Sequence, residues 1–332
     1  MNEIPRLANA IALIFGLVIL LSAVSLLLAV NPKIFEKGKD IAEMSVVQKI
    51  KLWQAPDTAS IPRNKEGDLI RYGRDLIART SHYLGPHGTV KNISNGMNCQ
   101  NCHLNAGTKP FGNNYGSVAS MYPKFRPRSG TVESIEKRIN DCLERSLNGQ
   151  PLDSLSKEIR AMSSYIRWIG KDVPKGEKAE GSGLVEITWL SRAANPVTGK
   201  KLYLKNCQVC HGFSGQGQRL SAEGQFIYPP MWGESSFNTG AGLFRISNLA
   251  RYLRTNMPNG ATHEKPILTE EQAWDVAAYV VSMPRPEKKF TKDWPDITTK
   301  PVDHPFGPYT DNFTEEQHKY GPFQPILDVS KK

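Results

Sequence analysis

The chain has 332 residues, enough for two domains of ordinary size, and a formal net charge of +10. Hydrophobic residues make up 39% and charged residues 22% of it, so its bulk is ordinary globular protein. The basic residues are scattered and no nucleic-acid-binding motif is present. This pattern argues against a nucleic-acid partner and leaves anionic substrates or membrane surfaces as partners.

The first predicted element is a membrane anchor over residues 1–31. The segment from Ala10 to Val30 carries no charge and is rich in Leu, Ile, Val and Ala, and it is long enough to cross a bilayer as one helix. A cleaved signal peptide is the alternative, but its apolar core is usually only about 7–15 residues long. We therefore expect an uncleaved helix that tethers the chain to the membrane.

The first domain is predicted over residues 67–175, after a proline-interrupted stalk and lead-in at 32–66. Apolar side chains at intervals of three and four predict its opening helix over residues 67–80. The run Cys99-Gln100-Asn101-Cys102-His103 follows, with the spacing of a c-type haem attachment site. Two thiols at this spacing reach the two vinyl groups of one haem, and the adjacent histidine is then held beneath the iron.

The motif recurs as Cys207-Gln208-Val209-Cys210-His211, so four of the five cysteines belong to two such sites. Two CxxC pairs can also bind one zinc ion, but these pairs are much farther apart than in zinc ribbons, and zinc needs no histidine after both. Redox motifs of the thioredoxin type do not call for that histidine either. We expect two covalently bound haem c groups with His103 and His211 as proximal ligands.

A linker at residues 176–195 leads to a second domain at 196–285. Further helices are expected in both domains, at residues 131–147, 154–169, 199–205, 247–255 and 269–283. The halves look like an internal repeat of helix, haem motif, irregular loop and later helices. This order predicts an all-α fold of two fused class I cytochrome c domains with long irregular loops.

The remaining segment, residues 286–332, is rich in proline and aromatic residues and has no helical period. Its aromatic content argues against simple disorder. We expect an extended tail that wraps over the surface of the domains.

A second axial ligand is expected for each iron. In the second domain, Met257 lies in a Pro/Gly turn before the last helix, where a soft thioether ligand raises the reduction potential. Met231, which follows two prolines, is the rival candidate. In the first domain the matching position is Cys142, which precedes Tyr165 by almost the interval at which Met257 precedes Tyr279.

Cys142 is the one cysteine outside the haem motifs, and taken alone it could be a buried free thiol. However, Arg138 and Ser146 lie at i−4 and i+4 from it, and Arg145 lies at i+3, all on or beside one helix face. Guanidinium groups stabilise a thiolate and can hold an oxyanion. The pattern indicates a thiolate on iron in a basic site for an anionic sulfur substrate.

The two haem runs, residues 138–149, Asn256-Met257-Pro258 and parts of the tail together resemble the dihaem c-type thiosulfate dehydrogenase / tetrathionate reductase family. Residues 138–149 are the specific part, because the haem pentapeptides are generic to c-type cytochromes. The resemblance implies that two thiosulfates are oxidised to tetrathionate, or the reverse. Some relatives carry lysine just before the methionine, and these two residues exchange as iron ligands. The present chain has Asn256 at that position, so no such exchange is expected.

The resemblance also implies residue roles. The first haem would have His103 and Cys142 as its axial ligands and would be the active site, with Arg128, Arg138 and Ser146 lining the substrate pocket. The second haem, with His211 and Met257, would pass electrons to a periplasmic cytochrome c or a similar carrier.

Two alternatives remain at this point. One is a non-catalytic, membrane-tethered dihaem electron carrier, whose sixth ligands would be Met or His residues such as Met97, Met121, His82 and His87. The other is a sulfur-carrier cytochrome of a sulfur-oxidation complex.

Lysines after the apolar segment would by charge counting place the chain in the cytoplasm. Haem attachment to CxxCH occurs outside the bacterial inner membrane, so we expect a periplasmic location.

Overall fold

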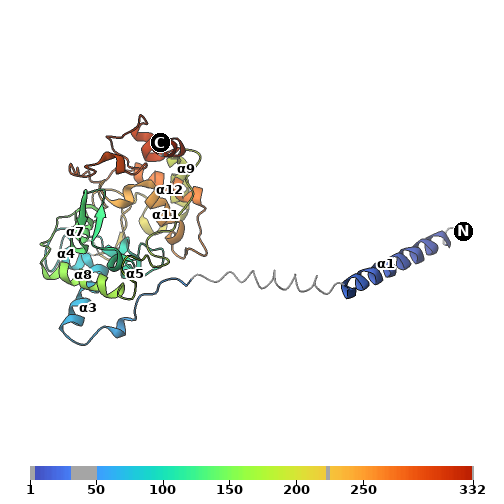
Figure 1. The fold of residues 1–332 in the computed structure, drawn as a ribbon. Coiled ribbons are helices and arrows are strands. Elements are labelled where there is room, and N and C mark those ends of the chain that lie inside the picture. The colour runs from blue at the N-terminus through green and yellow to red at the C-terminus, as the bar shows by residue number, and fades with distance from the viewer. Residues whose placement is uncertain (1–3, 31–50, 222–224, 331–332) are drawn as a thin grey trace. The chain divides into compact units, whose positions relative to one another are not determined.

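The computed structural model describes residues 4–30, 51–221 and 225–330. The chain divides into two compact units, residues 1–51 and residues 52–332. The second unit contains both haem-attachment runs (Figure 1). Most of the predicted stalk at 32–66 lies outside the described residues.

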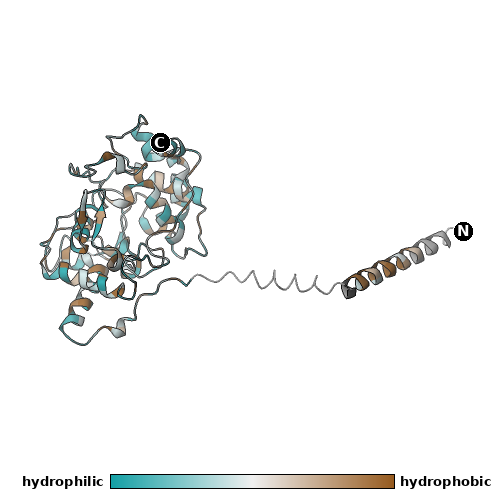
Figure 2. Cartoon of the chain, in the orientation of Figure 1, coloured by the Kyte–Doolittle hydropathy of each residue, from teal (hydrophilic) through white to brown (hydrophobic). Residues whose placement is uncertain are grey.

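The first unit contains helix α1, which spans Ile4–Val30. Large apolar side chains are exposed along its middle, from Leu13 to Leu27. Most residues of this part of the helix are hydrophobic (Figure 2). Nevertheless, no helix among the described residues is long and apolar enough to cross a membrane. The predicted anchor over residues 1–31 is therefore not supported.

Two helices cross closely at the core of the first haem-binding half. Helix α3 (Lys65–Ala78) is capped by Asn64, whose side chain accepts a hydrogen bond from Gly67 N, and α8 (Lys157–Ile169) is capped by Ser156. A Cβ atom on Gly73 would lie 1.9 Å from the Ala161 carbonyl oxygen, so only glycine permits this crossing. The first haem run forms a 3-10 turn, η2 (Cys99–Asn101), beside this pair.

The second half repeats the arrangement. Helix α9 (Pro196–Asn206) has a proline in its first turn and crosses α12 (Glu270–Ser282), which begins with a capping box. A Cβ atom on Gly199 would lie 1.8 Å from the Asp275 carbonyl oxygen. The predicted internal repeat thus extends to the same glycine-dependent crossing in each half. Helix α11 (Ile246–Asn256) packs against α12.

Further elements connect these helices. In the first half they are η1 (Thr58–Ser60), α4 (Thr80–Leu84), α5 (Leu104–Gly107), α6 (Val118–Met121) and α7 (Ile135–Arg145). In the second half they are α10 (Gln208–His211) and η3 (Gly242–Phe244).

The expectation of an all-α fold needs a correction, because the chain is mostly helical but has a few strands. Strands β1 (Lys124–Arg126) and β2 (Thr131–Glu133) pair antiparallel, with Lys124 opposite Glu133. Strands β3 (Gln218–Arg219) and β4 (Phe226–Tyr228) form a second antiparallel pair. The helix predicted from residue 131 is α7, which begins at Ile135 after the Ser134 cap, because residues 131–133 are used by the β1–β2 pair.

The tail also differs from expectation. It contains η4 (Ile297–Thr299), α13 (Glu315–Tyr320) and α14 (Gln324–Ser330). Phe323 is fully buried, with its ring 5.0 Å from Trp189 and 5.5 Å from Trp274. The tail therefore contributes to the core of the second half and does not only cover its surface.

Replacing Phe323 with alanine should lower the unfolding free energy of the holoprotein by about 3–5 kcal/mol, because it leaves a cavity beside Trp274. Denaturant unfolding followed by tryptophan fluorescence measures the change. Val329→Ala is the control in the same tail, since Val329 is 48% exposed and should change stability by about 0.5 kcal/mol or less. Equal effects of both variants would contradict the buried position of Phe323.

Candidate functional site

A cavity of about 170 Å³ lies between the first haem run and helix α7. Six of the residues predicted from the sequence for the first haem and its substrate line this cavity. They are Cys99, Cys102, His103, Arg138, Cys142 and Ser146, the last at the end of α7. The structure therefore brings the haem-attachment residues together with the cysteine and the arginine that follow far later in the chain.

His103 is held in one orientation. Its Nδ1 lies 2.5 Å from the carbonyl oxygen of Asn113, which can only accept, so Nδ1–H donates and Nε2 is left for a metal. Burial lowers the pKa of His103 to about 4, which keeps the imidazole neutral, as a ligand must be. The role of Asn113 could not be predicted from the sequence, because its backbone carbonyl makes the contact and every residue type has one.

Arg138 and Cys142 face each other one turn apart on α7. Arg138 Nη1 donates to Cys142 Sγ at 3.2 Å, and the Cys142 sulfur is the main cause that raises the pKa of Arg138 above its ordinary value. The guanidinium is thus kept charged beside the sulfur. A hydrogen bond from a charged donor is the interaction that favours a thiolate over a thiol.

Arg128 does not line the Cys142 cavity. It follows β1 and lines a neighbouring cavity of about 620 Å³, which it shares with the tail. Its Nη1 donates to the Gly240 carbonyl at 3.2 Å, and its Nε lies 3.9 Å from Asp293. The backbone of Trp294 donates to the Arg128 carbonyl, which keeps this turn against the tail. The structure therefore separates Arg128 from the other three residues of the predicted pocket.

The tail also holds the end of α7. Arg145 makes a bidentate ion pair with Asp293, with N–O distances of 2.8 and 2.7 Å, and its guanidinium lies 3.6 Å from the centre of the Phe290 ring. Lys288 Nζ donates to the Gly149 carbonyl at 2.9 Å, just beyond the helix. These contacts join residues that are far apart in sequence, so no local pattern could have predicted them.

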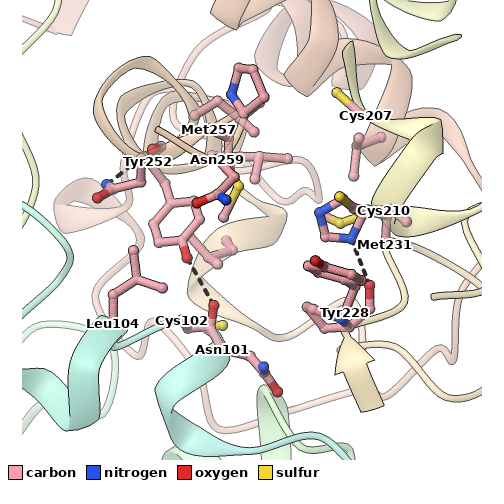
Figure 3. A pocket seen from close by; sticks show the side chains of 18 of the residues that line it. Asn101, Cys102, Leu104, Cys207, Cys210, Tyr228, Met231, Tyr252, Met257 and Asn259 are labelled. Carbon is pink, nitrogen blue, oxygen red and sulfur yellow. Dashed lines mark hydrogen bonds between the residues drawn. The ribbon is translucent and has the colours of Figure 1, made fainter. Parts of the chain in front are cut away.

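The second haem run lines a cavity of about 470 Å³ (Figure 3). His211 Nδ1 lies 2.8 Å from the Pro229 carbonyl oxygen, which repeats the arrangement at His103. Both candidate methionines line the cavity. Met257 lies across it from Cys207 and Cys210, whereas Met231 lies on the side of Cys210 (Figure 3).

Each cavity thus combines two attachment cysteines, a neutral histidine with a free Nε2 and a further sulfur side chain, and this donor set fits a covalently held haem. Burial raises the pKa of Cys99, Cys102 and Cys207 to about 12, so these sulfurs stay uncharged. Buried sulfurs at this spacing suit the two thioether bonds of a covalently attached haem. Across the described ranges, no three metal-binding side chains converge on one point.

Both halves of the chain match known protein families. A family model for the SoxA/TsdA cytochrome c domain matches residues 89–174, and one for cytochrome c matches residues 196–284. The chain is 37% identical over 242 residues to a thiosulfate dehydrogenase of Psychrobacter arcticus, covering 73% of this chain and 71% of the relative. It is 36% identical to a thiosulfate dehydrogenase of Allochromatium vinosum, covering 70% of this chain and 83% of that relative.

A solved structure is also similar. It is a thiosulfate dehydrogenase (TsdBA) from Marichromatium purpuratum in its as-isolated form, with a TM-score of 0.67 and 27% sequence identity. The match covers 78% of this chain and 53% of the solved chain. The present chain therefore spans about half the length of that protein.

Asp293→Asn should destabilise the protein by about 3 kcal/mol, because it leaves the buried Arg145 charge without its ion-pair partner. Denaturant unfolding of the holoprotein measures this loss. Asp68→Asn is a matched control that breaks an exposed pair with Arg71 and should cost less than about 1 kcal/mol. A loss at Asp293 no larger than at Asp68 would show that the tail does not hold α7.

Proposed function

The chain belongs to the dihaem c-type thiosulfate dehydrogenase family, and we propose that its chemistry takes place in the cavity that Cys142 shares with the first haem run. It is an oxidoreductase with two covalently bound haem c groups. The reaction we infer joins two thiosulfate ions into one tetrathionate ion with release of two electrons, or runs in reverse. The contact between Arg138 and Cys142 is the observation that carries this proposal.

The main electrostatic barrier is repulsion between the two dianions. Two unit charges 4 Å apart at an effective dielectric constant of 20 repel by about 4 kcal/mol, so two dianions repel by about 16 kcal/mol. A fixed guanidinium beside the reacting sulfur offsets part of this repulsion without reorganising during the reaction. Arg138 has this position, and Ser146 lines the same cavity.

We propose that Cys142 takes part covalently. Its thiolate forms a sulfur–sulfur bond with the outer sulfur of a first thiosulfate, and this oxidation releases two electrons. The terminal sulfur of a second thiosulfate then attacks the adduct sulfur that is bonded to Cys142 Sγ. The bond to Sγ breaks, so that tetrathionate leaves and the Cys142 thiolate is restored. Charge balances in both steps, and no proton is needed. Arg138 stabilises the thiolate at the start and as the leaving group at the end.

The bound haem groups supply one-electron acceptors, and two of them match the two electrons of one turnover. We propose that His103 and Cys142 would hold the iron of the first haem, and that His211 and Met257 would hold the iron of the second. The opposed positions of Met257 and Cys210 in Figure 3 support this choice over Met231. We place the chain in the periplasm, where a cytochrome c or similar carrier would accept the electrons.

The non-catalytic alternative requires a Met or His as sixth ligand in the first domain. None of Met97, Met121, His82 and His87 lines the cavity that holds His103. Met162 does line it, but it is 1% exposed within the packed core of α3 and α8. Cys142 is the better-placed donor, which favours an enzyme over a simple electron carrier.

Cys142→Ala should leave both haems attached, because their thioethers come from other cysteines, while tetrathionate formation falls to the uncatalysed background. Haem content per chain and steady-state turnover with thiosulfate measure the two effects separately. Retained turnover in this variant would rule out the covalent role of Cys142.

Arg138→Gln should lower kcat for thiosulfate by about 10²–10³-fold, the usual effect of removing one preorganised donor from a site of developing charge. Arg160→Gln on the exposed face of α8 is the control and should leave kcat within twofold, roughly the scatter expected of a surface change. Steady-state kinetics on both variants test the assignment, and an unchanged kcat in Arg138→Gln would contradict it.

A further inference from the structure

The cavity of the second haem site is built from both domains. Besides Cys207, Cys210 and His211, its wall includes residues of the first haem run, among them Asn101 and Cys102 (Figure 3). Cys102 also lines the cavity of the first site. One attachment sulfur of the first haem therefore belongs to the wall of both cavities, so the two cofactor sites adjoin at this residue.

Helix α11 joins the two domains at this point. Tyr252 on α11 is 5% exposed, and its hydroxyl donates to the Asn101 carbonyl at 2.8 Å, directly beside Cys102 (Figure 3). One turn later Asn256 Nδ2 donates to the carbonyl of Phe111 in the first domain at 3.0 Å. Both bonds cross from the second domain to the first.

The same helix ends at the proposed sixth ligand of the second site. Met257 is the residue that follows α11, and its N–H still bonds to Leu253. Any displacement of α11 would thus move Met257 and the contact to Asn101 together. At position 256 the asparagine serves as a contact to the other domain.

We propose that Tyr252 and Asn256 form a clasp that holds the Cys102 edge of the first haem site against the second haem site and so sets the rate at which electrons pass between them. This inference rests on the electron path proposed above. The step is the transfer of one electron from the iron held by His103 to the iron held by His211, and it occurs twice per tetrathionate. No bond forms or breaks, and Tyr252 is a positioning residue.

Two observations indicate that the Tyr252 hydroxyl acts as a structural hydrogen-bond donor. Burial raises the pKa of Tyr252 well above its ordinary value, which keeps the phenol protonated and able to donate. Within each domain, a tyrosine makes a comparable bond, from Tyr165 to the Ala106 carbonyl and from Tyr203 to the Gly212 carbonyl. Tyr252 differs from these because its bond connects the domains.

The test compares Tyr252→Phe with Tyr165→Phe in the dihaem holoprotein. Each removes one buried phenol hydroxyl from a backbone carbonyl, but only the first bond crosses between domains, and Tyr165 lines neither haem cavity. A photosensitiser delivers one electron to the oxidised protein, and absorbance follows its redistribution between the haems. We expect redistribution to slow by about fivefold in Tyr252→Phe, the order by which one buried hydrogen bond shifts an equilibrium, and to stay unchanged in Tyr165→Phe.

Asn256→Ala removes the second bond of the clasp and should also slow redistribution, which keeps the inference testable if Tyr252→Phe does not fold. An unchanged rate in the clasp variants, or an equal slowing in Tyr165→Phe, would overturn it. Because light and not thiosulfate supplies the electron, the measurement works even if the proposed reaction is wrong. Failure of the clasp and failure of the proposed function are therefore distinguishable.

Discussion

The proposed activity depends on one interaction, the hydrogen bond from Arg138 to the sulfur of Cys142. It places a fixed positive charge where a thiolate and two dianions have to meet, and without it their mutual repulsion would dominate. The hydrogen bond itself requires only that both residues lie one turn apart on α7. For the proposed reaction, this face of α7 must also point at the first haem run, and contacts at the two ends of the helix set that orientation. Ser134 starts the helix, and the Arg145–Asp293 pair holds its end.

The two halves use the same scaffold for different tasks. In each, two helices cross at a glycine, a tyrosine bonds to a carbonyl near the haem run, and a backbone oxygen orients the proximal histidine. The difference lies in the other side chains that line each cavity. In the first half the helix α7 presents Cys142 and Arg138, whereas in the second half α11 ends and presents Met257 in a turn. A polar, charged ligand environment suits substrate chemistry, and a thioether suits electron storage.

Contacts between the halves join the two similar domains into one structural unit. The tail inserts Phe323 into the second core and reaches back with Asp293 to Arg145 of the first domain. Tyr252 and Asn256 join α11 to the first haem run and its following loop. The second cofactor cavity therefore has no complete wall without the first domain. A shared wall keeps the two cofactor sites adjacent, which a flexible linker alone would not ensure.

The sequence by itself determined the two haem attachments, the helical repeat and the candidate residues of α7, because these are encoded in spacings of a few residues along one helix or one turn. It also placed Cys142 and Met257 correctly within their elements. Only the tertiary structure decided that Arg128 lies in a neighbouring cavity, that residues 131–133 form a strand, and that the tail enters the core. It likewise revealed Asn113, Pro229, Asp293 and Tyr252 as partners. These contacts join distant segments, often through backbone carbonyls, and such pairings leave no local pattern in the amino-acid sequence.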